Sequence, residues 1–232
     1  MSHLKGFILL AALFVTSSAF AEDGMYVSLG AGLGKVSKVK SNQDFPLVLK
    51  SPGVFATPIT EMTLDFKNAI RINGAIGYKT GDFRVEFEPS YLKAKYKKID
   101  QKPYPLIAAK DLSGYVRSLS GFMNGYYDFP VSDTLVPYVG AGLGYTRIKN
   151  HLEHAGLVDF NGGGQAVNLP TLKFNMSDNS LAYQAIAGFM VNLTNQFALT
   201  VDYRFSSTTK KMLAFNDKLK SHVATLGLMY KF

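Results

Sequence analysis

The chain has 232 residues and a net charge of +8, with 13% aromatic residues and no cysteine. Without cysteine, the protein forms no disulfide and holds no thiolate-bound metal. Beyond residue 21, no stretch approaches the roughly 18 uninterrupted apolar residues of a membrane-spanning helix. The mean hydropathy of +0.05 is close to zero for a basic chain, which is typical of apolar residues that alternate with polar ones.

Residues 1–21 have the features of an export signal. Lys5 supplies the positive start, "FILLAALFV" (7–15) is a short apolar run, and Ala19 and Ala21 form an A-x-A cleavage site. The run is too short to cross a bilayer as a helix. The sequence therefore predicts a signal peptide over 1–21 and one mature domain over 22–232.

A glycine-rich stretch, "LGAGLGKV" (29–36), returns almost unchanged as "VGAGLGYT" (139–146). A dinucleotide-binding loop needs a further glycine where Lys35 and Tyr145 stand, and a P-loop needs glycine at 29 and serine or threonine at 36. Both nucleotide motifs therefore fail. The period of two instead predicts strands with one apolar face and one face nearly free of side chains.

Alternation of apolar and polar residues recurs in eight segments. The most regular is "FALTVDYRF", in which every second residue is large and apolar. The predicted strands are, in chain order, 25–36, 68–79, 83–91, 117–129, 136–148, 181–193, 197–205 and 222–232.

The connections between these strands are alternately short and long. The short ones, at 80–82, 130–134 and 194–196, predict tight hairpin turns. The long ones lie at 37–66, 93–112, 149–180 and 206–220. This layout is typical of an all-β, eight-stranded antiparallel transmembrane β-barrel with short periplasmic turns and long extracellular loops.

A sheet within the lipid bilayer must close into a barrel, because every backbone N–H and C=O group in the bilayer needs a partner within the protein. Eight strands enclose a lumen that side chains fill, so the bare glycine faces are expected to point inward, beside larger side chains. A soluble lipocalin-like barrel is the alternative fold. Aromatic residues near the predicted strand ends favour the membrane barrel, since they suit its interfacial girdles. They are Tyr78, Tyr91, Tyr127, Tyr145 and Phe232.

Six charged residues fall on predicted inward faces. Charges in a lumen are costly unless they are paired. They predict either a gated ion path or a salt-bridged plug, and the narrowness of eight strands favours the plug. These residues are Arg71, Arg84, Glu86, Glu88, Asp202 and Arg204.

Lysine is in excess in the second and fourth long loops. Because these loops are expected to face outside the cell, the predicted partners are lipopolysaccharide phosphates or acidic host glycans rather than nucleic acid. A solvated lysine-rich rim is the alternative. The candidate basic patch consists of Lys95, Lys97, Lys98, Lys210 and Lys211.

The segment "HLEH" (151–154) places two histidines in the third long loop, near Glu153 and Asp159. A zinc site needs three or four ligands held rigidly, so this loop is weak support for a metal. A lipid-A-modifying hydrolase would use His151 or His154 as its base, but no serine stands in a recognisable nucleophile motif. We therefore expect no cofactor and no catalysis.

Several segments, taken in order, match a known group of proteins. They are "GYKTGDFRVEFEPSY" (77–91), "NGYYDF" (124–129), "PYVGAGLGY" (137–145), "YQAIAGFMVNL" (183–193), "VDYRF" (201–205) and "GLMYKF" (227–232). Together they resemble the bacterial surface-antigen family (major surface protein type), which is allied to the OmpA-type and opacity-type eight-stranded barrels. The resemblance covers all eight strands but not the long loops. It implies an integral outer-membrane protein exposed to the host, sometimes with adhesin or weak porin activity.

The resemblance also implies a role for the last strand. A terminal aromatic residue on an alternating strand is read by the outer-membrane assembly machinery, and here the candidate signal is Leu228, Tyr230 and Phe232. The expected protein is a monomer with an adhesin-like or envelope-structural role. A small-solute, porin-like channel and a lipid-A-modifying enzyme are the alternatives.

Overall fold

The computed structural model describes residues 23–41, 61–102, 111–155, 157–159, 166–168, 172–211 and 217–232. The predicted signal peptide, with Ala19 and Ala21, lies outside the described residues. Within them, no helix is long and apolar enough to cross a membrane. Eight long strands are present: β1 (Gly24–Val36), β3 (Glu61–Thr80), β4 (Phe83–Lys102), β5 (Asp111–Asp128), β6 (Leu135–Ala155), β9 (Leu172–Asn192), β10 (Phe197–Thr208) and β11 (Lys220–Lys231).

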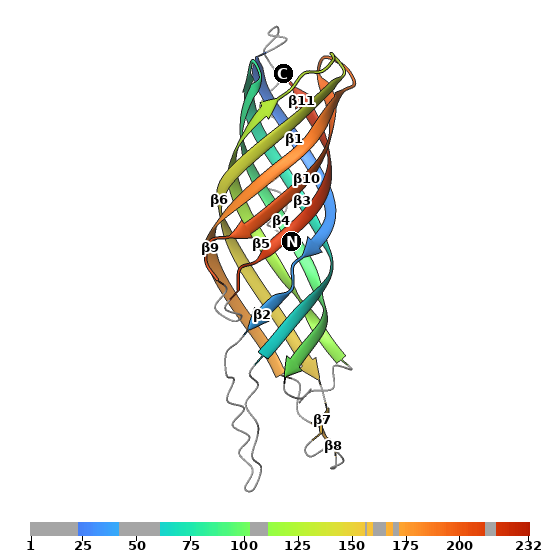
Figure 1. Ribbon diagram of the computed structural model, residues 1–232, viewed down its shortest axis with the longest axis vertical. Helices are drawn as coiled ribbons and strands as arrows, with labels where there is room; N and C mark the ends of the chain where they lie inside the picture. The colour runs from blue at the N-terminus through green and yellow to red at the C-terminus, as the bar shows by residue number, and fades with distance from the viewer. Residues whose placement is uncertain are drawn as a thin grey trace, which may run out of the picture.

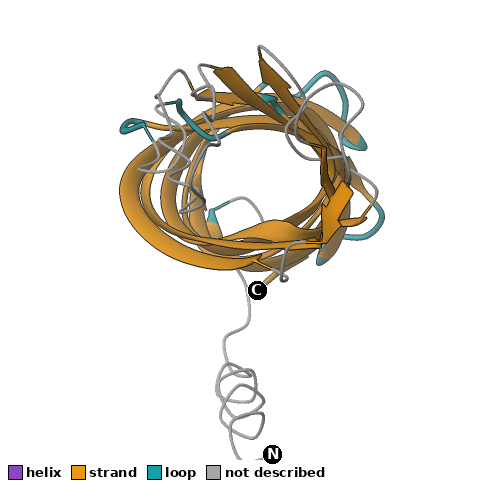
Figure 2. Ribbon diagram, turned by 90° about the horizontal axis from the view of Figure 1, so that it is seen from below, coloured by secondary structure: helices purple, strands orange, loops and turns teal. Residues whose placement is uncertain are grey.

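The eight long strands form one closed antiparallel barrel. They pair in the order β1-β11-β10-β9-β6-β5-β4-β3, and β1 also pairs with β3, which joins the two edges of the sheet. Figure 2 shows the strands as a ring. The short β2 (Val39–Ser41) pairs with β3, and β7 (Leu157–Asp159) and β8 (Ala166–Asn168) pair with each other. The predicted fold class is confirmed.

Three short turns gather at one end of the barrel, called here the turn end, and the opposite ends of the strands form the loop end (Figure 1). In the first turn, Thr80 pairs with Phe83, so Gly81 and Asp82 alone connect β3 to β4. Gly81 has a φ of 54°, which glycine adopts without steric cost. Its backbone N–H donates to the carboxylate of Asp23 at 2.5 Å, which ties the start of the described chain to this turn.

Five strands extend well beyond their predicted limits, and β10 continues from the predicted end at Phe205 to Thr208. β3, β4, β5, β6 and β9 continue beyond the predicted strand limits into the segments 61–67, 92–102, 111–116, 149–155 and 172–180, which were expected to be largely loops. The prediction of loop bounds was therefore wrong at these places. Figure 1 shows the extensions as the lower part of the barrel, beyond the ends of β1, β10 and β11.

The cause is that the alternation along a strand continues with a period of two, while the apolar residues change from the outward face to the inward face. On β4, charged and polar side chains point into the lumen as far as Ser90, and apolar ones point outward as far as Tyr91. Beyond that point the inward residues are Leu92, Ala94 and Tyr96, all buried, and the outward residues are lysines. A search for segments with an apolar outer face therefore ends these strands too early.

This exchange marks the boundary of the lipid-facing part of the barrel. The outward apolar face of β4 runs from Phe83 to Tyr91, which matches the roughly 9–11 residues that a tilted strand needs to cross the hydrocarbon. The extension beyond it is built like a water-soluble barrel, polar outside and apolar inside. Its core is Val36, Val39, Leu64, Phe66, Ala69, Leu92, Ala94, Tyr96, Val116, Ile148, Leu219 and Val223.

A bulge in β3 allows the extension to keep its apolar side inward. The register between β3 and β4 shifts between Phe66 and Ala69, so that both of these residues are buried, while Lys67 and Asn68 between them are exposed. A bulge inserts an extra residue into one strand, and here it moves Phe66 into the lumen, where its ring lies 5.2 Å from that of Tyr96.

The bare glycine faces point into the lumen, as predicted, and two positions show why. A Cβ atom at Gly77 would overlap the ring of Tyr26, and one at Gly140 would overlap the ring of Tyr126. Both tyrosines are buried. Glycine on one strand therefore leaves the space that a large inward side chain on the neighbouring strand occupies.

The aromatic residues of the outer face are arranged differently from the prediction. At the turn end they form edge-to-face pairs, with Tyr127 contacting both Phe83 and Phe129, and the ring centre of Tyr230 lying 5.0 Å from that of Phe232. Tyr91 and Tyr145, expected near strand ends, lie well inside β4 and β6 because those strands are longer. They mark the edge of the apolar band rather than the end of the strand.

Cysteine labelling tests this boundary, because the chain has no cysteine of its own. We expect Lys95→Cys to react with a membrane-impermeant maleimide on intact cells, since its side chain faces water beyond the apolar band. Phe87→Cys, at an outward position within the band, should react only after detergent is added. Equal protection of both positions would place Lys95 in lipid and contradict the boundary.

Candidate functional site

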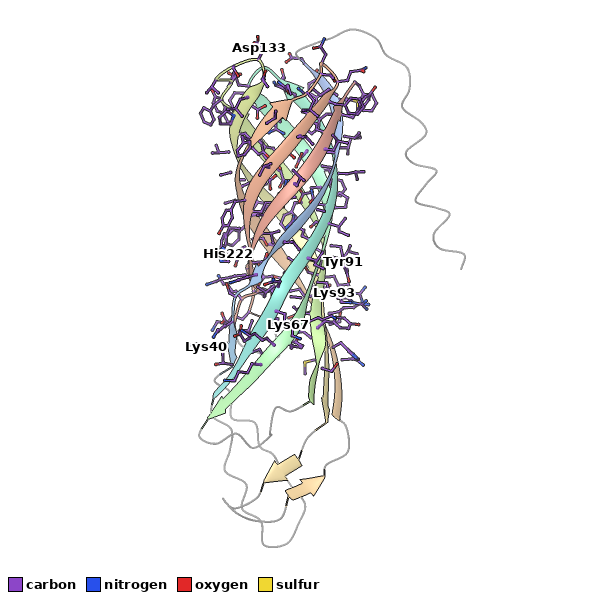
Figure 3. The ribbon with its side chains drawn as sticks, turned by 90° about the vertical axis from the view of Figure 1, so that its right-hand side faces the viewer. Lys40, Lys67, Tyr91, Lys93, Asp133 and His222 are labelled. Atoms are coloured by element: carbon purple, nitrogen blue, oxygen red, sulfur yellow. The ribbon has the colours of Figure 1, made fainter. Side chains whose placement is uncertain are left out.

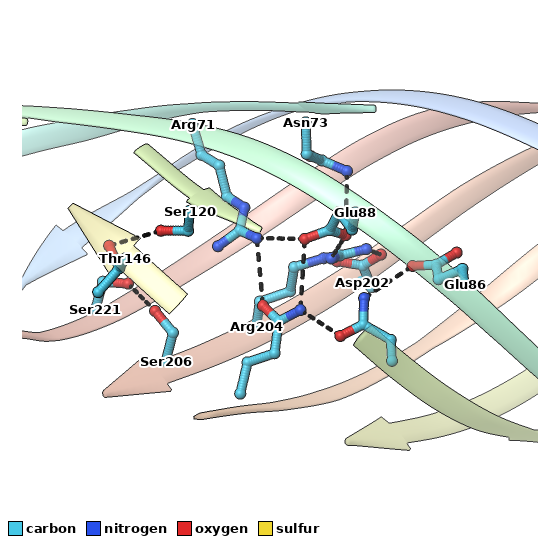
Figure 4. A network of polar contacts seen from close by, with 12 residues as sticks. Arg71, Asn73, Glu86, Glu88, Ser120, Thr146, Asp202, Arg204, Ser206 and Ser221 are labelled. Carbon is cyan, nitrogen blue, oxygen red and sulfur yellow. Dashed lines mark hydrogen bonds and ion pairs between the residues drawn. The ribbon is translucent and has the colours of Figure 1, made fainter. Parts of the chain in front are cut away.

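The six predicted inward charges all lie in the lumen and are buried, with exposed fractions from 0% at Glu88 to 6% at Arg204. They come from β3, β4 and β10. In the ring of strands, β4 and β10 stand on opposite sides, so their side chains meet across the lumen (Figure 4).

Glu88 is the centre of this network. Its Oε1 accepts a hydrogen bond from Nη2 of Arg71 at 2.6 Å, and its Oε2 accepts one from Nη1 of Arg204. Gln184 and Asn73 also donate to it, each at 3.4 Å. Two guanidinium partners offset the cost of burying this carboxylate in the lumen. The bond to Arg204 also joins β4 to β10 through the middle of the barrel.

Arg204 bridges two carboxylates. Its Nε donates to Oδ1 of Asp202 at 2.7 Å and its Nη2 donates to Oδ2 at 3.1 Å. The hydroxyl of Tyr138 donates to the same carboxylate at 3.0 Å. Together with the bond to Glu88, this engages all three nitrogens of the guanidinium, which fixes its position in the lumen.

Arg84 pairs with a residue that sequence reasoning missed. Its Nε lies 2.9 and 3.0 Å from the two carboxylate oxygens of Asp128 on β5. Its guanidinium also lies 4.6 Å from the ring centre of Tyr126 and 4.8 Å from that of Tyr138, at cation–π distance. The signal for Asp128 was available, because it shares the inward face of β5 with Asn124 and Tyr126.

Glu86 differs from the expectation that every inward charge has a charged partner. Its carboxylate accepts hydrogen bonds from the hydroxyls of Tyr126 and Tyr26, at 2.5 and 3.0 Å, and from the amide of Asn124 at 3.0 Å. All three donors are neutral. Three hydrogen bonds stabilise the carboxylate, so its position does not depend on a cation. The prediction of ion pairing was wrong for this residue.

Gln184 on β9 is a second residue that the sequence did not reveal. Its amide nitrogen donates to the side-chain oxygen of Asn124 at 2.7 Å, and its oxygen accepts from Arg71 at 3.2 Å. It thereby connects the group around Glu86 to the group around Glu88. An amide is common on a polar inward face, and its role as the connector depends on which strands meet.

Two small cavities lie on either side of the charged network among the described residues. Toward the loop end, a cavity of about 30 Å³ lies beside Arg71, Ser118 and Thr146. Toward the turn end, another of about 30 Å³ lies between Tyr26, Arg84 and Met229. Each has room for about one water molecule. Between them stands the charged network, and the apolar core of the extension lies beyond the first. The hydrogen-bonded side chains therefore stand across the lumen between the two cavities.

The candidate basic patch is divided by the fold. Lys95, Lys97 and Lys98 lie on β4 rather than in a loop, and the first two point outward. Lys210 and Lys211 follow β10 and are exposed. Since β4 and β10 are opposite in the ring, these lysines cannot act as one patch.

The predicted histidine loop is partly strand. β6 continues to Ala155, and on it the Nδ1 of His151 lies 2.5 Å from the side-chain oxygen of Asn175. The side chains of His154, Glu153 and Asp159 lie outside the described residues. Among the side chains that are described, no three of histidine, cysteine, aspartate or glutamate are grouped to hold a metal ion.

The candidate assembly signal lies on β11. Leu228 points outward and is 46% exposed, and Tyr230 packs between Phe197 and Phe232 at ring distances of 5.1 and 5.0 Å. The backbone N–H of Phe232 donates to the carbonyl of Met25 at 3.1 Å, beside the pairing of β1 with β11 that closes the barrel.

A closed antiparallel barrel with an apolar outer band, a polar lumen and short turns at one end defines an integral outer-membrane protein. Residues 7–232 match the family model of the outer membrane protein beta-barrel domain, and the chain belongs to this family. It is therefore a protein of the bacterial outer membrane, with its loops exposed at the cell surface.

Similar proteins agree with this assignment. The chain is 28% identical to the opacity protein opA65 of Neisseria gonorrhoeae over 118 residues, which cover 46% of this chain and 49% of that protein. It is 23% identical to opacity protein opA67 of the same organism over 185 residues, 68% of this chain and 76% of the other. The chain thus spans about half the length of opA65. The crystal structure of Neisserial surface protein A has the same fold, with a TM-score of 0.50, 20% identity, and coverage of 93% of this chain and all of the other.

Two substitutions distinguish a paired carboxylate from one held by neutral donors. We expect Glu88→Gln to lower the free energy of unfolding by on the order of 3–5 kcal/mol, because it leaves two buried guanidinium groups without their shared partner. The matched control is Glu86→Gln, which removes the same charge but leaves no cation without a partner. It should lower the free energy of unfolding by about 1–2 kcal/mol. Urea unfolding in phospholipid vesicles, followed by tyrosine fluorescence, measures both. Equal losses would contradict the central role of Glu88.

Proposed function

We propose that this protein is an adhesin-like surface protein, in which a closed and plugged barrel holds extracellular segments at a fixed height above the membrane. The observation that carries the proposal is the extension of five strands beyond the apolar band, with its own apolar core. A barrel that only anchored a chain or conducted solutes would not need this part. Its rigidity suits the presentation of a surface to another cell.

The lumen supports this role over a small-solute channel. Eight strands leave little room, and the side chains of Arg71, Glu88 and Arg204 occupy what remains, bonded across the barrel. A channel would need this network to open, which would leave its charges without partners. We further propose that the protein is a monomer without a cofactor and without catalytic activity.

Host-surface glycans or proteins and lipopolysaccharide are the proposed partners. Lys210 and Lys211 stand exposed just beyond β10, where they would meet acidic saccharides on an approaching surface. Lys93, the first outward lysine of β4, stands just beyond Tyr91 at the edge of the apolar band and suits lipid phosphates instead. The similarity to opacity proteins supports an outer-membrane surface role, and the particular partner is part of the proposal.

We also propose that the outer-membrane assembly machinery recognises β11 through Leu228, Tyr230 and Phe232. Support comes from their place in the barrel, because β11 supplies one side of the seam with β1. Until this seam forms, both strands present unpaired backbone groups that lipid does not tolerate.

Adhesion and conductance together test the proposed function. Expression in a non-adherent bacterium should increase binding to host cells or immobilised acidic glycans, and Lys210→Glu with Lys211→Glu should reduce it. The binding should weaken as salt rises, since the Debye length falls from about 10 Å at 0.1 M to about 3 Å at 1 M. The purified barrel should not conduct in planar bilayers and should not hydrolyse labelled lipid A. Steady conductance, hydrolysis, or no gain in adhesion would contradict the proposal.

The assembly role has a matched control on the same end of the barrel. We expect Phe232→Ala to slow insertion and to accumulate unfolded protein in the periplasm, as measured by pulse-chase labelling. Phe129→Ala removes an exposed aromatic side chain from the β5–β6 turn region and should insert at the normal rate. If both variants insert normally and only lose stability, Phe232 is an interfacial girdle residue and no signal.

A further inference from the structure

A groove of about 310 Å³ lies on the outer surface of the barrel, where β5, β6 and β9 pass beyond the apolar band. It belongs neither to the lumen network nor to the predicted basic patch. Its polar lining comes from side chains of all three strands. They include Tyr115, Arg117, Arg147, Lys149, His151 and Asn175.

Three cations form a row across neighbouring strands beside this groove. Lys93 on β4 stands directly opposite Arg117 on β5, and Arg117 stands directly opposite Lys149 on β6. All three occupy outward positions in the alternation of their strands. Like charges directly opposite one another in a sheet are destabilising. The three cations of this row therefore repel one another, and a bound anion would reduce the repulsion.

No acidic side chain relieves it among the residues that the structure describes. The contacts of Lys93 and Arg117 are with the ring of Tyr115, at 4.6 and 5.7 Å from its centre. Arg147 makes a long hydrogen bond of 3.5 Å to the hydroxyl of Ser177. Elsewhere on the outer surface a cation does have an acidic partner, since Lys38 lies 3.5 Å from Asp65.

The height of the groove on the barrel indicates which anionic groups the row of cations would meet. Along β5 toward the loop end, the last large apolar residue that points outward is Leu119, which is 61% exposed. The next outward residue in that direction is Arg117. On β6 the order is Tyr145 and then Arg147. Figure 3 shows the same step on β4, with Lys93 just beyond Tyr91. The groove therefore lies level with the headgroups of the outer leaflet and not at the exposed rim.

We infer that this groove binds the phosphate of a phosphorylated glycolipid of the outer leaflet, with its acyl chains lying against the apolar band below. Arg117 and Arg147 would hold the phosphate through paired N–H donors, a geometry that guanidinium groups provide and ammonium groups do not. Lys149 and Lys93 add charge. Asn175 and the hydroxyl of Tyr115 are placed to hydrogen-bond the attached sugar. The inference rests on the proposed contact with lipopolysaccharide and is independent of the adhesin role.

The test compares two triple variants with the same change in charge. The groove variant is Arg117→Gln, Arg147→Gln and Lys149→Gln. The control is Lys210→Gln, Lys211→Gln and Lys220→Gln, three exposed lysines outside the groove, beside the end of β10 and at the start of β11. Binding of diphosphorylated lipid A, dephosphorylated lipid A and inorganic phosphate to the purified barrel in detergent is measured by native mass spectrometry.

We expect the wild type and the control to bind diphosphorylated lipid A equally, and the groove variant to bind it about tenfold more weakly or worse. Dephosphorylated lipid A should bind all three proteins alike and weakly. Equal losses in both variants would show non-specific attraction and overturn the site. Binding of inorganic phosphate as strong as that of the lipid would overturn a lipid as the source of the anion. Host-cell adhesion of the groove variant, measured in parallel, should be unchanged, which separates this result from a failure of the proposed function.

Thermal stability supplies a readout that does not depend on binding assays. Without lipid A, the groove variant should melt at a higher temperature than the wild type, because the repulsion in the row is gone. With diphosphorylated lipid A present, the wild type should gain stability by mass action and the variant should not. A groove variant that is less stable than the wild type under both conditions would show that the row is structural and would overturn the proposal.

Discussion

Everything in this molecule follows from the requirement that backbone N–H and C=O groups within lipid bond to other groups of the protein. Strands satisfy it only as a closed sheet, and closure depends on the pairing of β1 with β11. With eight strands, closure leaves a lumen narrow enough for side chains to cross. The bond from Arg204 to Glu88 spans it. The network across the lumen is therefore a consequence of the strand number as much as of the residues that form it.

The same strands face lipid along one part of their length and water along the other. In the lipid-facing part they carry apolar side chains outside and a polar lumen, and in the extension they carry lysines outside and an apolar core. The change requires no break in the strand, because the period of two is unchanged and only the faces are exchanged. The boundary between the two parts is where aromatic residues give way to cations. This is also the level at which the membrane presents its own phosphates, so the cations of the outer surface stand where a partner of opposite charge is available.

Charged side chains in the lumen and on the outer surface differ in whether they have partners within the protein. Inside, Arg71, Arg84 and Arg204 each have a carboxylate partner within the protein, because water is scarce there and an unpaired charge is costly. Outside, the cations beside the groove have no acidic partner among the described side chains. The contrast supports a structural role for the interior charges and is the basis of the binding role proposed for the exterior ones. It also explains why a surface protein of this kind is basic as a whole while its lumen is nearly neutral.

The sequence by itself determined the strand count, the turns and the inward faces, because period-two alternation and short polar turns are local properties of the chain. It also placed the six lumen charges on their faces. It did not determine the strand ends, since a polarity exchange on the same period looks like the start of a loop. Nor did it show that Asp128 and Gln184 join the network, that Glu86 is held by neutral donors, or that Lys95 and Lys210 stand on opposite sides. Those facts depend on shear and strand order, which decide the residues that meet across the lumen and the lysines that share one surface. Only the closed tertiary structure, in which distant strands become neighbours, decided them.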